Sequence, residues 1–254
     1  MALITEIAPE VYRISIYNPD IHLQFNHFLV RDDQPLLFHA GYRRMFDELR
    51  EAVRTLIDPA RLRYISFSHF ESDECGGLNH WLELAPQAEA ICGFVGAIVN
   101  LNDFAIRPVR TVSNEDRMDT GRHRFRFLAT PQVPHGWDAG VLFEETQATL
   151  FCSDLFHQWG DVEPLSQSSV LNRAREALVQ IEAGPLARYL PYTRHTGRIL
   201  EELAQLEPRT LAIMHGSSFR GDGATELRGL AELWRVTLSG PEASLPAGKT
   251  STAG

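Results

Sequence analysis

The sequence predicts an α/β fold in which two packed β-sheets are covered by helices on their outer faces. Strand-like segments rich in β-branched and aromatic residues alternate with helix-like segments in the first half, and strands return after helices in the second half. Two sheets packed together with helices outside is one of the few ways to bury the apolar faces of such elements. With 254 residues, 44% of them hydrophobic, the chain could form one large domain or two small ones, and we expect one.

The first half is expected to begin as a strand meander followed by a covering helix. Strands are predicted at 11–17, 25–30 and 35–38. A helix is predicted where apolar residues repeat at helical spacing, at Met45, Leu49, Val53 and Leu56. A buried strand at 62–67 leads into a polar segment, which Gly76 and Gly77 separate from a short helix at 78–84.

The second half repeats the two kinds of element. Strands are predicted at 125–128, 140–143, 149–152 and 209–214. Amphipathic helices are predicted at 170–183, 188–206 and 226–238. From Ser239 the composition turns to Gly, Pro, Ala, Ser and Thr, which cannot build a core. We therefore expect one domain over 1–238 and a disordered tail over 239–254.

Composition excludes several classes of partner. The net charge of −9 and the scattered Lys and Arg residues leave no basic face for a nucleic acid. No apolar run approaches the roughly 20 residues of a membrane span, and the chain does not start like a leader, so we expect a cytoplasmic protein with no membrane partner. Cys75, Cys92 and Cys152 lack CxxC spacing and are expected as small buried residues, although Cys75 lies near the polar segment and could be reactive. A homodimer is compatible with the sequence.

Six side chains that can bind metal follow apolar runs or tight turns. They are His69, Glu71, Asp73, His135, Asp154 and His215. The first three alternate, so they would converge if the segment stays extended, whereas on a helix only the outer two would share a face. Each of the later three, taken alone, is more often a structural histidine or a capping aspartate. Together, three imidazoles and three carboxylates could gather two adjacent cations, a donor set that favours iron, with manganese and zinc as competitors.

The order and spacing of these residues resemble the metallo-β-lactamase superfamily. Within it, they resemble the di-iron domain of flavodiiron proteins and the related stand-alone oxygen-binding di-iron proteins. The superfamily's HxHxDH motif appears here as His69-x-Glu71-x-Asp73, with the glutamate of the flavodiiron variant. Segments 25–30 and 151–156 and the triplet Met214-His215-Gly216 also match family segments, and the resemblance covers about residues 5 to 238.

The resemblance implies an αββα sandwich of two mixed sheets flanked by helices, with two iron ions at one edge of the sheets. It assigns the ligands residue by residue. The first iron would be held by His69, Glu71 and His135, the second by Asp73 and His215, and Asp154 would bridge them.

Three departures from the family's pattern bear on this assignment. A histidine often follows the motif aspartate, but here Glu74 stands there as a substitute ligand, a hydrogen-bond acceptor behind the ligands, or a solvent-facing acid. The superfamily's earlier strand-end aspartate appears as His39, which, like His157, is a candidate for orienting ligands without binding metal. Too few residues follow His215 for a flavodoxin-like module, and no phosphate loop occurs elsewhere, so we expect no flavin in this chain.

The resemblance implies a non-haem di-iron protein that binds O2 or NO. Reduction would require a separate donor, flavodoxin-like or rubredoxin-like. An O2 sensor or carrier with a signalling partner is equally compatible, so the sequence does not decide whether the protein is an enzyme. The alternative is a dinuclear metallohydrolase acting on an ester, thioester or phosphodiester, which Glu71 disfavours because it makes a bridging hydroxide less acidic. A metal-free scaffold is the least favoured hypothesis.

Overall fold

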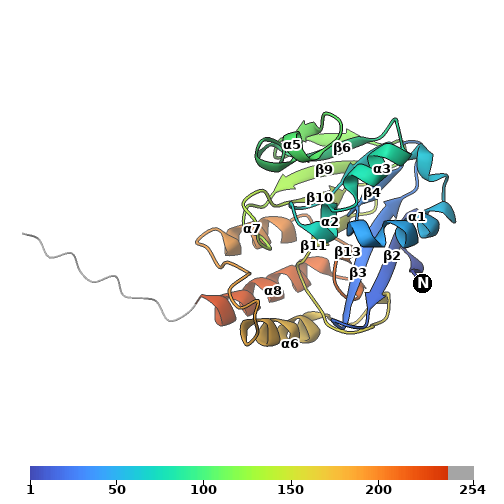
Figure 1. The fold of residues 1–254 in the computed structure, drawn as a ribbon. Helices are drawn as coiled ribbons and strands as arrows, with labels where there is room; N and C mark the ends of the chain where they lie inside the picture. Colours follow the sequence, from blue (N-terminus) through green and yellow to red (C-terminus); the bar gives the residue numbers. More distant parts are fainter. Residues whose placement is uncertain (240–254) are drawn as a thin grey trace, which may run out of the picture.

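The chain folds into two seven-stranded sheets that pack face to face, as a computed structural model of residues 1–239 shows (Figure 1). The first sheet has the order β1-β2-β3-β4-β5-β6-β7, and the second β12-β14-β13-β11-β10-β9-β8. In the first sheet β1 to β4 pair antiparallel and β4 to β7 parallel. The second sheet also mixes the two, because β11 and β13 are parallel while β9, β10 and β11 are antiparallel. The predicted αββα arrangement of mixed sheets is confirmed.

The elements have the following bounds. The first sheet contains β1 (Leu3–Ala8), β2 (Val11–Asn18), β3 (Leu23–Val30), β4 (Leu36–Phe38), β5 (Tyr64–Ser66), β6 (Glu89–Gly93) and β7 (Arg110–Val112). The second contains β8 (Arg117–Asp119), β9 (Arg124–Ala129), β10 (Gly140–Glu144), β11 (Thr149–Ser153), β12 (Leu165–Ser166), β13 (Thr210–Ile213) and β14 (Ser218–Arg220). The helices are η1 (Arg43–Met45), α1 (Phe46–Arg54), η2 (Pro59–Arg61), α2 (Ser72–Cys75), α3 (Leu78–Leu84), α4 (Phe94–Gly96), η3 (Ala97–Leu101), α5 (Asn102–Phe104), α6 (Leu171–Glu182), α7 (Thr196–Ala204) and α8 (Gly223–Leu238).

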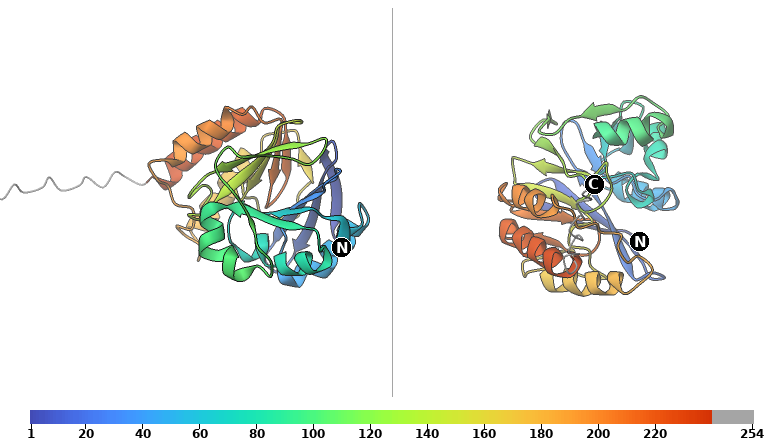
Figure 2. Two further views of the ribbon diagram at one scale, coloured as in Figure 1. Left: turned by 90° about the horizontal axis from the view of Figure 1, so that it is seen from above. Right: turned by 90° about the vertical axis from the view of Figure 1, so that its left-hand side faces the viewer.

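The two sheets lie between outer helices (Figure 2). Three apolar layers hold this sandwich together. The central layer lies between the sheets and includes Phe28 and Phe38 of the first sheet and Phe151 of the second. One outer layer packs α1 and α3 on the first sheet, with Trp81 fully buried. The other packs α6, α7 and α8 on the second sheet, where Trp234 is buried. Because strands inside such a stack have both faces covered, all eight residues of β3 are buried.

A buried carboxylate joins the two sheets at the end of the sandwich where β3 gives way to β4. Asp32 lies in that turn and accepts hydrogen bonds from the N–H groups of Arg122 and His123, at 2.9 Å each, and from the Thr120 hydroxyl at 2.8 Å. All three donors belong to the turn between β8 and β9 of the second sheet. Burial alone would raise the pKa of Asp32, but these donors stabilise the ionised form and lower the pKa to about 2.

Most of the predicted elements are present, with corrections. The predicted helix at 188–206 is wrong at its start, because α7 begins only at Thr196. Pro191 provides no N–H and its ring excludes a preceding helical turn, so 188–195 forms a connecting segment instead. Six strands were not predicted: β1, β6, β7, β8, β12 and β14. All but Ser239 of the predicted tail lies outside the described residues.

Two further expectations from the sequence concern the cysteines and membrane-spanning segments. Cys75, Cys92 and Cys152 are buried free thiols, as expected for small buried residues. Burial raises the pKa of Cys92 to about 12, so its thiol is not reactive at neutral pH. Within residues 1–239, the helices are too short or too polar to cross a membrane.

Candidate metal centre

The candidate ligands gather at one edge of the sandwich, which we call the metal end. The parallel strands β5 of the first sheet and β11 and β13 of the second finish there, and a polar residue follows each of them. His69 lies beyond β5, Asp154 directly after β11, and His215 beyond β13. His135 comes from the loop before β10, which runs antiparallel to β11 and therefore starts at the same edge. The fold thus brings together residues that are far apart in the sequence.

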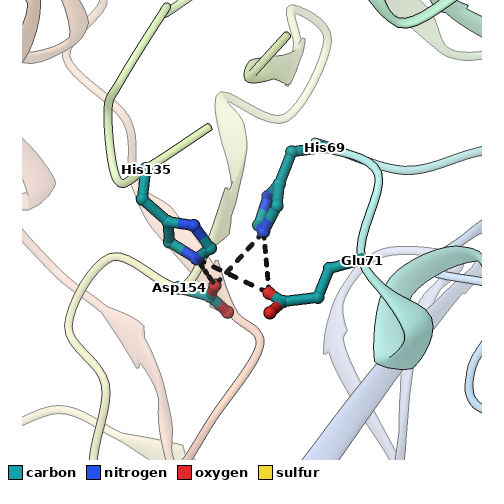
Figure 3. A group of neighbouring side chains, drawn as sticks. All are labelled: His69, Glu71, His135 and Asp154. Atoms are coloured by element: carbon teal, nitrogen blue, oxygen red, sulfur yellow. Dashed lines mark hydrogen bonds and ion pairs between the residues drawn. The ribbon is translucent and has the colours of Figure 1, made fainter. Parts of the chain in front are cut away.

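Four of the six residues form a tight first group (Figure 3). One atom from each of His69, Glu71, His135 and Asp154 lies within 4.8 Å of the others. Nε2 of His69 is 3.0 Å from Oε2 of Glu71, and Nε2 of His135 is 2.9 Å from Oδ2 of Asp154. The imidazoles and the Asp154 carboxylate are largely buried, whereas half of the Glu71 side chain is exposed. This group can enclose one cation and leaves a side open to solvent.

The remaining two residues form a second group on the other side of Asp154. Nε2 of His215 lies 3.4 Å from Oδ2 of Asp73 and 3.2 Å from Oδ1 of Asp154. Asp154 therefore presents Oδ2 to the first group and Oδ1 to the second, as a bridging carboxylate would. Oδ1 of Asp73 is buried without a hydrogen-bond partner among the described residues, and His215 is the ion-pair partner of Oδ1 of Asp154. Buried carboxylate oxygens are costly to leave unpaired, so a cation is the natural partner here.

Backbone conformation separates the two groups. The segment is extended at Glu71, where φ is −133° and ψ is 150°, but α2 begins at Ser72. The segment therefore stays extended only as far as Glu71, so the condition for all three side chains to converge is not met. Because Asp73 lies in the first turn of α2, its carboxylate faces His215 instead of converging with His69.

The loop that carries His135 is fixed against the strand that carries His69. Oδ2 of Asp138 accepts the N–H of Phe70 at 3.0 Å, and the N–H of Gly140 donates to the Ser68 carbonyl at 2.9 Å. Gly136, with φ of +83°, lies so close that a Cβ there would be 3.4 Å from Cβ of His69. Only glycine adopts this conformation and approach without strain, so the glycine after His135 is a structural requirement.

Hydrogen bonds on the far side of two imidazole rings direct Nε2 toward the site. Nδ1 of His215 donates to the Gln24 carbonyl at 2.9 Å. Nδ1 of His69 lies 2.7 Å from the Ser68 hydroxyl. A partner at Nδ1 fixes the ring orientation and leaves Nε2 to bind a metal, as is usual for ligating histidines.

Glu74 points away from both groups and into the protein. It is fully buried, and its Oε2 accepts the N–H groups of Ser68 at 2.7 Å and His69 at 3.0 Å. Its Oε1 accepts the hydroxyls of Ser68 at 2.9 Å and Ser153 at 2.7 Å. Of the three roles open from the sequence, the geometry supports a hydrogen-bond acceptor behind the ligands.

His39 lies next to Glu74 in this buried network. Its Nδ1 donates to the Asn26 carbonyl at 3.1 Å, and its Nε2 lies 3.4 Å from Oε1 of Glu74. Burial alone would raise the pKa of Glu74, but the imidazoles of His69 and His39 outweigh burial and lower it. His39 therefore contacts the carboxylate that supports His69 and contacts no candidate ligand through a hydrogen bond among the described residues.

Protons on two imidazoles offset the negative charge of the carboxylates at the site. Burial alone would lower the pKa of His69, but the carboxylates around it raise the pKa to about 10. Burial likewise opposes protonation of His215, yet Asp154 and Asp73 raise its pKa well above the usual range. His69 and His215 are thus held in their protonated form, and metal binding has to release those protons.

Two further aromatic residues lie at the site. The ring of His157 is 4.8 Å from that of His215, and its Nε2 is buried without a hydrogen-bond partner in the described part of the chain. Burial lowers the pKa of His157 to about 3, so the ring is neutral. Tyr189 packs edge-on against His135, with ring centroids 5.0 Å apart. Tyr189 was not predicted to lie at the site, because the helix predicted over 188–206 gave no reason to place it near His135.

The donor set fits a pair of borderline-to-hard cations. Three imidazole nitrogens and three carboxylates converge, none of the candidate ligands is a thiol, and Asp154 faces both groups. Such donors suit iron, manganese or zinc.

This fold, with a possible metal site at the edge of its sheets, is that of the metallo-β-lactamase superfamily. A family model described as "ODP family beta lactamase" matches residues 23–216, most of the chain. The chain belongs to this family.

Curated relatives and solved structures agree with the assignment. The chain is 24% identical over 164 residues to flavo-diiron protein FprA2 of Clostridium acetobutylicum, covering 59% of this chain and 41% of that protein. It is 25% identical over 210 residues to a nitric oxide reductase of Moorella thermoacetica, covering 78% and 50%. The structure of rubredoxin oxygen:oxidoreductase from Desulfovibrio gigas matches with a TM-score of 0.75 at 19% identity, over 91% of this chain and 61% of that one. This chain therefore spans about half the length of these curated relatives.

Proposed function

We propose that this protein is a non-haem di-iron protein that binds O2 or NO between two metal ions. His69, Glu71 and His135 hold the first ion, Asp73 and His215 hold the second, and Asp154 bridges them. The observation that carries the proposal is the position of Asp154, whose Oδ2 lies 2.9 Å from His135 and whose Oδ1 lies 3.2 Å from His215.

The carboxylate ligands offset most of the charge of two dications. Two such ions at close range repel each other strongly in a buried site, so a carboxylate between them is required. Asp154, Glu71 and Asp73 supply three negative charges, and Asp154 lies between the two imidazole groups. When ferrous, two adjacent ions supply one electron each to the same diatomic molecule.

The chain's own residues keep the site in shape. Phe25 packs edge-on against His215, with ring centroids 5.2 Å apart, and Tyr189 packs in the same way against His135. These contacts fix two of the three imidazole rings and restrict water on their outer faces. Half of the Glu71 side chain remains exposed, which leaves a route for a small diatomic molecule from solvent.

Names of the relatives support a redox function over hydrolysis. They include a nitric oxide reductase and a rubredoxin-oxygen oxidoreductase. The metallohydrolase alternative is not favoured by these relatives. We propose a separate flavodoxin-like or rubredoxin-like donor for turnover, and a signalling partner if the protein senses O2.

The test is anaerobic loading with ferrous iron followed by mixing with O2. We expect two iron ions per chain and a visible absorption band that outlasts a catalytic cycle, because two ferrous ions supply only two of the four electrons that reduce O2 to water. Adding a reduced flavodoxin-like or rubredoxin-like protein should shorten the life of the band. A reproducible zinc pair despite iron supplementation would count against the proposal. So would a colourless mixture that hydrolyses a thioester or phosphodiester.

A further inference from the structure

The two ligand groups are unequal in imidazoles. The first group contains two, His69 and His135, whereas the second contains only His215. The residue after Asp73 could have supplied another donor, but Glu74 is turned inward and its oxygens are occupied by Ser68, His69 and Ser153. The second ion is therefore one nitrogen short of the first.

His157 lies where it could supply a second imidazole nitrogen to the second group. It follows the bridging residue by three positions, at the end of a short loop in which Ser153 and Phe156 have positive φ values of 53° and 62°. Such values are uncommon outside glycine and cost free energy, so the surrounding structure imposes this loop path. Asp154 and His157 both line one small cavity of about 10 Å³ beneath α6 and α8.

The environment of Nε2 of His157 indicates a partner that the described residues do not supply. Nε2 of His157 is buried and has no hydrogen-bond partner among the described residues. An unsatisfied buried polar atom costs free energy, and most such atoms in proteins have a partner. Oδ1 of Asp73 shares this condition, and Asp73 belongs to the second group.

Ring spacing is compatible with a shared ion. His157 and His215 have centroids 4.8 Å apart with 47° between their planes. His69 and His135, the two imidazoles of the first group, are 4.2 Å apart. The second pair therefore resembles the first in its spacing.

We propose that His157 is a ligand of the second metal ion, so that each ion receives two imidazole nitrogens. This inference rests on the proposed dinuclear function. It replaces the expectation that His157 only orients other ligands, because no hydrogen bond joins His157 to Asp73, Asp154 or His215 in the described residues.

A crystal structure of the metal-loaded protein tests this directly. We expect Nε2 of His157 within bonding distance of the second ion, roughly 2.0–2.1 Å as for zinc-imidazole bonds. An ion held only by Asp73, His215 and Asp154, with His157 beyond hydrogen-bonding range or joined through water, would overturn the inference. The result does not depend on which metal binds or on O2, so a zinc pair would contradict the proposed function and still test His157.

Metal titration of His157→Ala gives an independent measure. The dissociation constant of the second equivalent should rise by more than the roughly 10- to 100-fold that loss of a supporting hydrogen-bond partner costs, while the first equivalent stays unchanged. His195→Ala is the matched control, because it removes an exposed imidazole at the start of α7 and should change neither equivalent. A smaller rise, or equal weakening of both equivalents, would overturn the inference. If His157→Ala does not fold by circular dichroism, the crystal structure of the unchanged protein decides.

Discussion

Both ends of the sandwich contain a buried carboxylate that joins the two sheets, and the two carboxylates differ in what they hold. At the end opposite the metals, Asp32 of the first sheet accepts hydrogen bonds from Thr120, Arg122 and His123 of the second. At the metal end, Glu74 accepts from Ser153 of the second sheet as well as from its own side. A buried carboxylate that accepts hydrogen bonds from several N–H and O–H groups therefore occurs at both ends of the sandwich.

The difference lies in the partners. Apart from the Arg122 guanidinium, the donors to Asp32 are backbone N–H groups and a hydroxyl, so it contributes to stability alone. Glu74 supports His69, and its partner Ser153 precedes Asp154 in the chain. Removing Asp32 should weaken the fold without disturbing metal binding, whereas changes at the metal end should alter metal content or reactivity first.

The largest effect is expected from Asp154→Ala, which should leave fewer than one iron ion per chain after anaerobic loading. One carboxylate faces both imidazole groups, so its loss leaves two cations repelling each other across solvent. Glu71→Ala should remove mainly the first ion, because Glu71 contacts only that group. Elemental analysis after desalting measures both variants.

Asp119→Ala is the control for this pair, since Asp119 is an exposed acid on β8. It should retain both ions. Equal and partial metal loss in Asp154→Ala and Glu71→Ala would remove the bridge from the assignment.

At the opposite end, Asp32→Ala should lower the free energy of unfolding by about 3 kcal/mol. The substitution removes the acceptor of three backbone N–H groups, those of Asp33, Arg122 and His123, and of the buried Thr120 hydroxyl, and each such loss costs roughly 1–3 kcal/mol before water compensates. Urea unfolding measures the loss. Iron content should stay at two per chain, and a drop in iron at unchanged stability would contradict the separation of the two ends.

The two ends also differ in how much the sequence could predict. The six candidate ligands were found because each follows an apolar strand or a tight turn, where parallel strand ends place side chains together. The bounds of α3 were predicted from the Gly76-Gly77 pair that precedes it. By contrast, the direction of Glu74 depends on Ser153, which lies 79 residues further along the chain, and no local pattern encodes that contact.

The missed elements have physical reasons. Strand β1 is only partly buried and shows no clean alternation, and β7 and β8 have three residues each, too few for a periodic signal. No role was predicted for Asp32, because aspartate is a common residue in turns. Tyr189 reaches His135 only because Pro191 prevents the helix that the apolar spacing suggested.

A smaller effect is expected from pH at Asp32. Its pKa is about 2 in the folded protein against an ordinary value of 3.8, so its contribution is present above the ordinary value and is lost as pH falls toward 2. The lowered pKa corresponds to roughly 2 kcal/mol. Urea unfolding of the protein without added metal should give a lower free energy of unfolding at pH 2.5 than at pH 5. In Asp32→Asn this decrease should be smaller by roughly 2 kcal/mol. Identical pH dependence in both proteins would show that the hydrogen bonds to Asp32 do not lower its pKa in the folded protein.

The smallest change in stability, below about 1 kcal/mol, is expected from Glu74→Gln, because an amide can still accept from the N–H groups of Ser68 and His69 and can donate to the Ser153 hydroxyl. Both ions should be retained, since Glu74 faces away from the ligand groups. The variant removes the negative charge behind His69, however, and a carboxylate there makes the imidazole a stronger donor to its metal. We therefore expect the visible band on mixing with O2 to form more slowly, by a few-fold in stopped-flow absorbance, at an iron content equal to that of the unchanged protein. Loss of one iron equivalent from this variant would show that Glu74 binds metal itself, as a further ligand where the structure shows a hydrogen-bond acceptor.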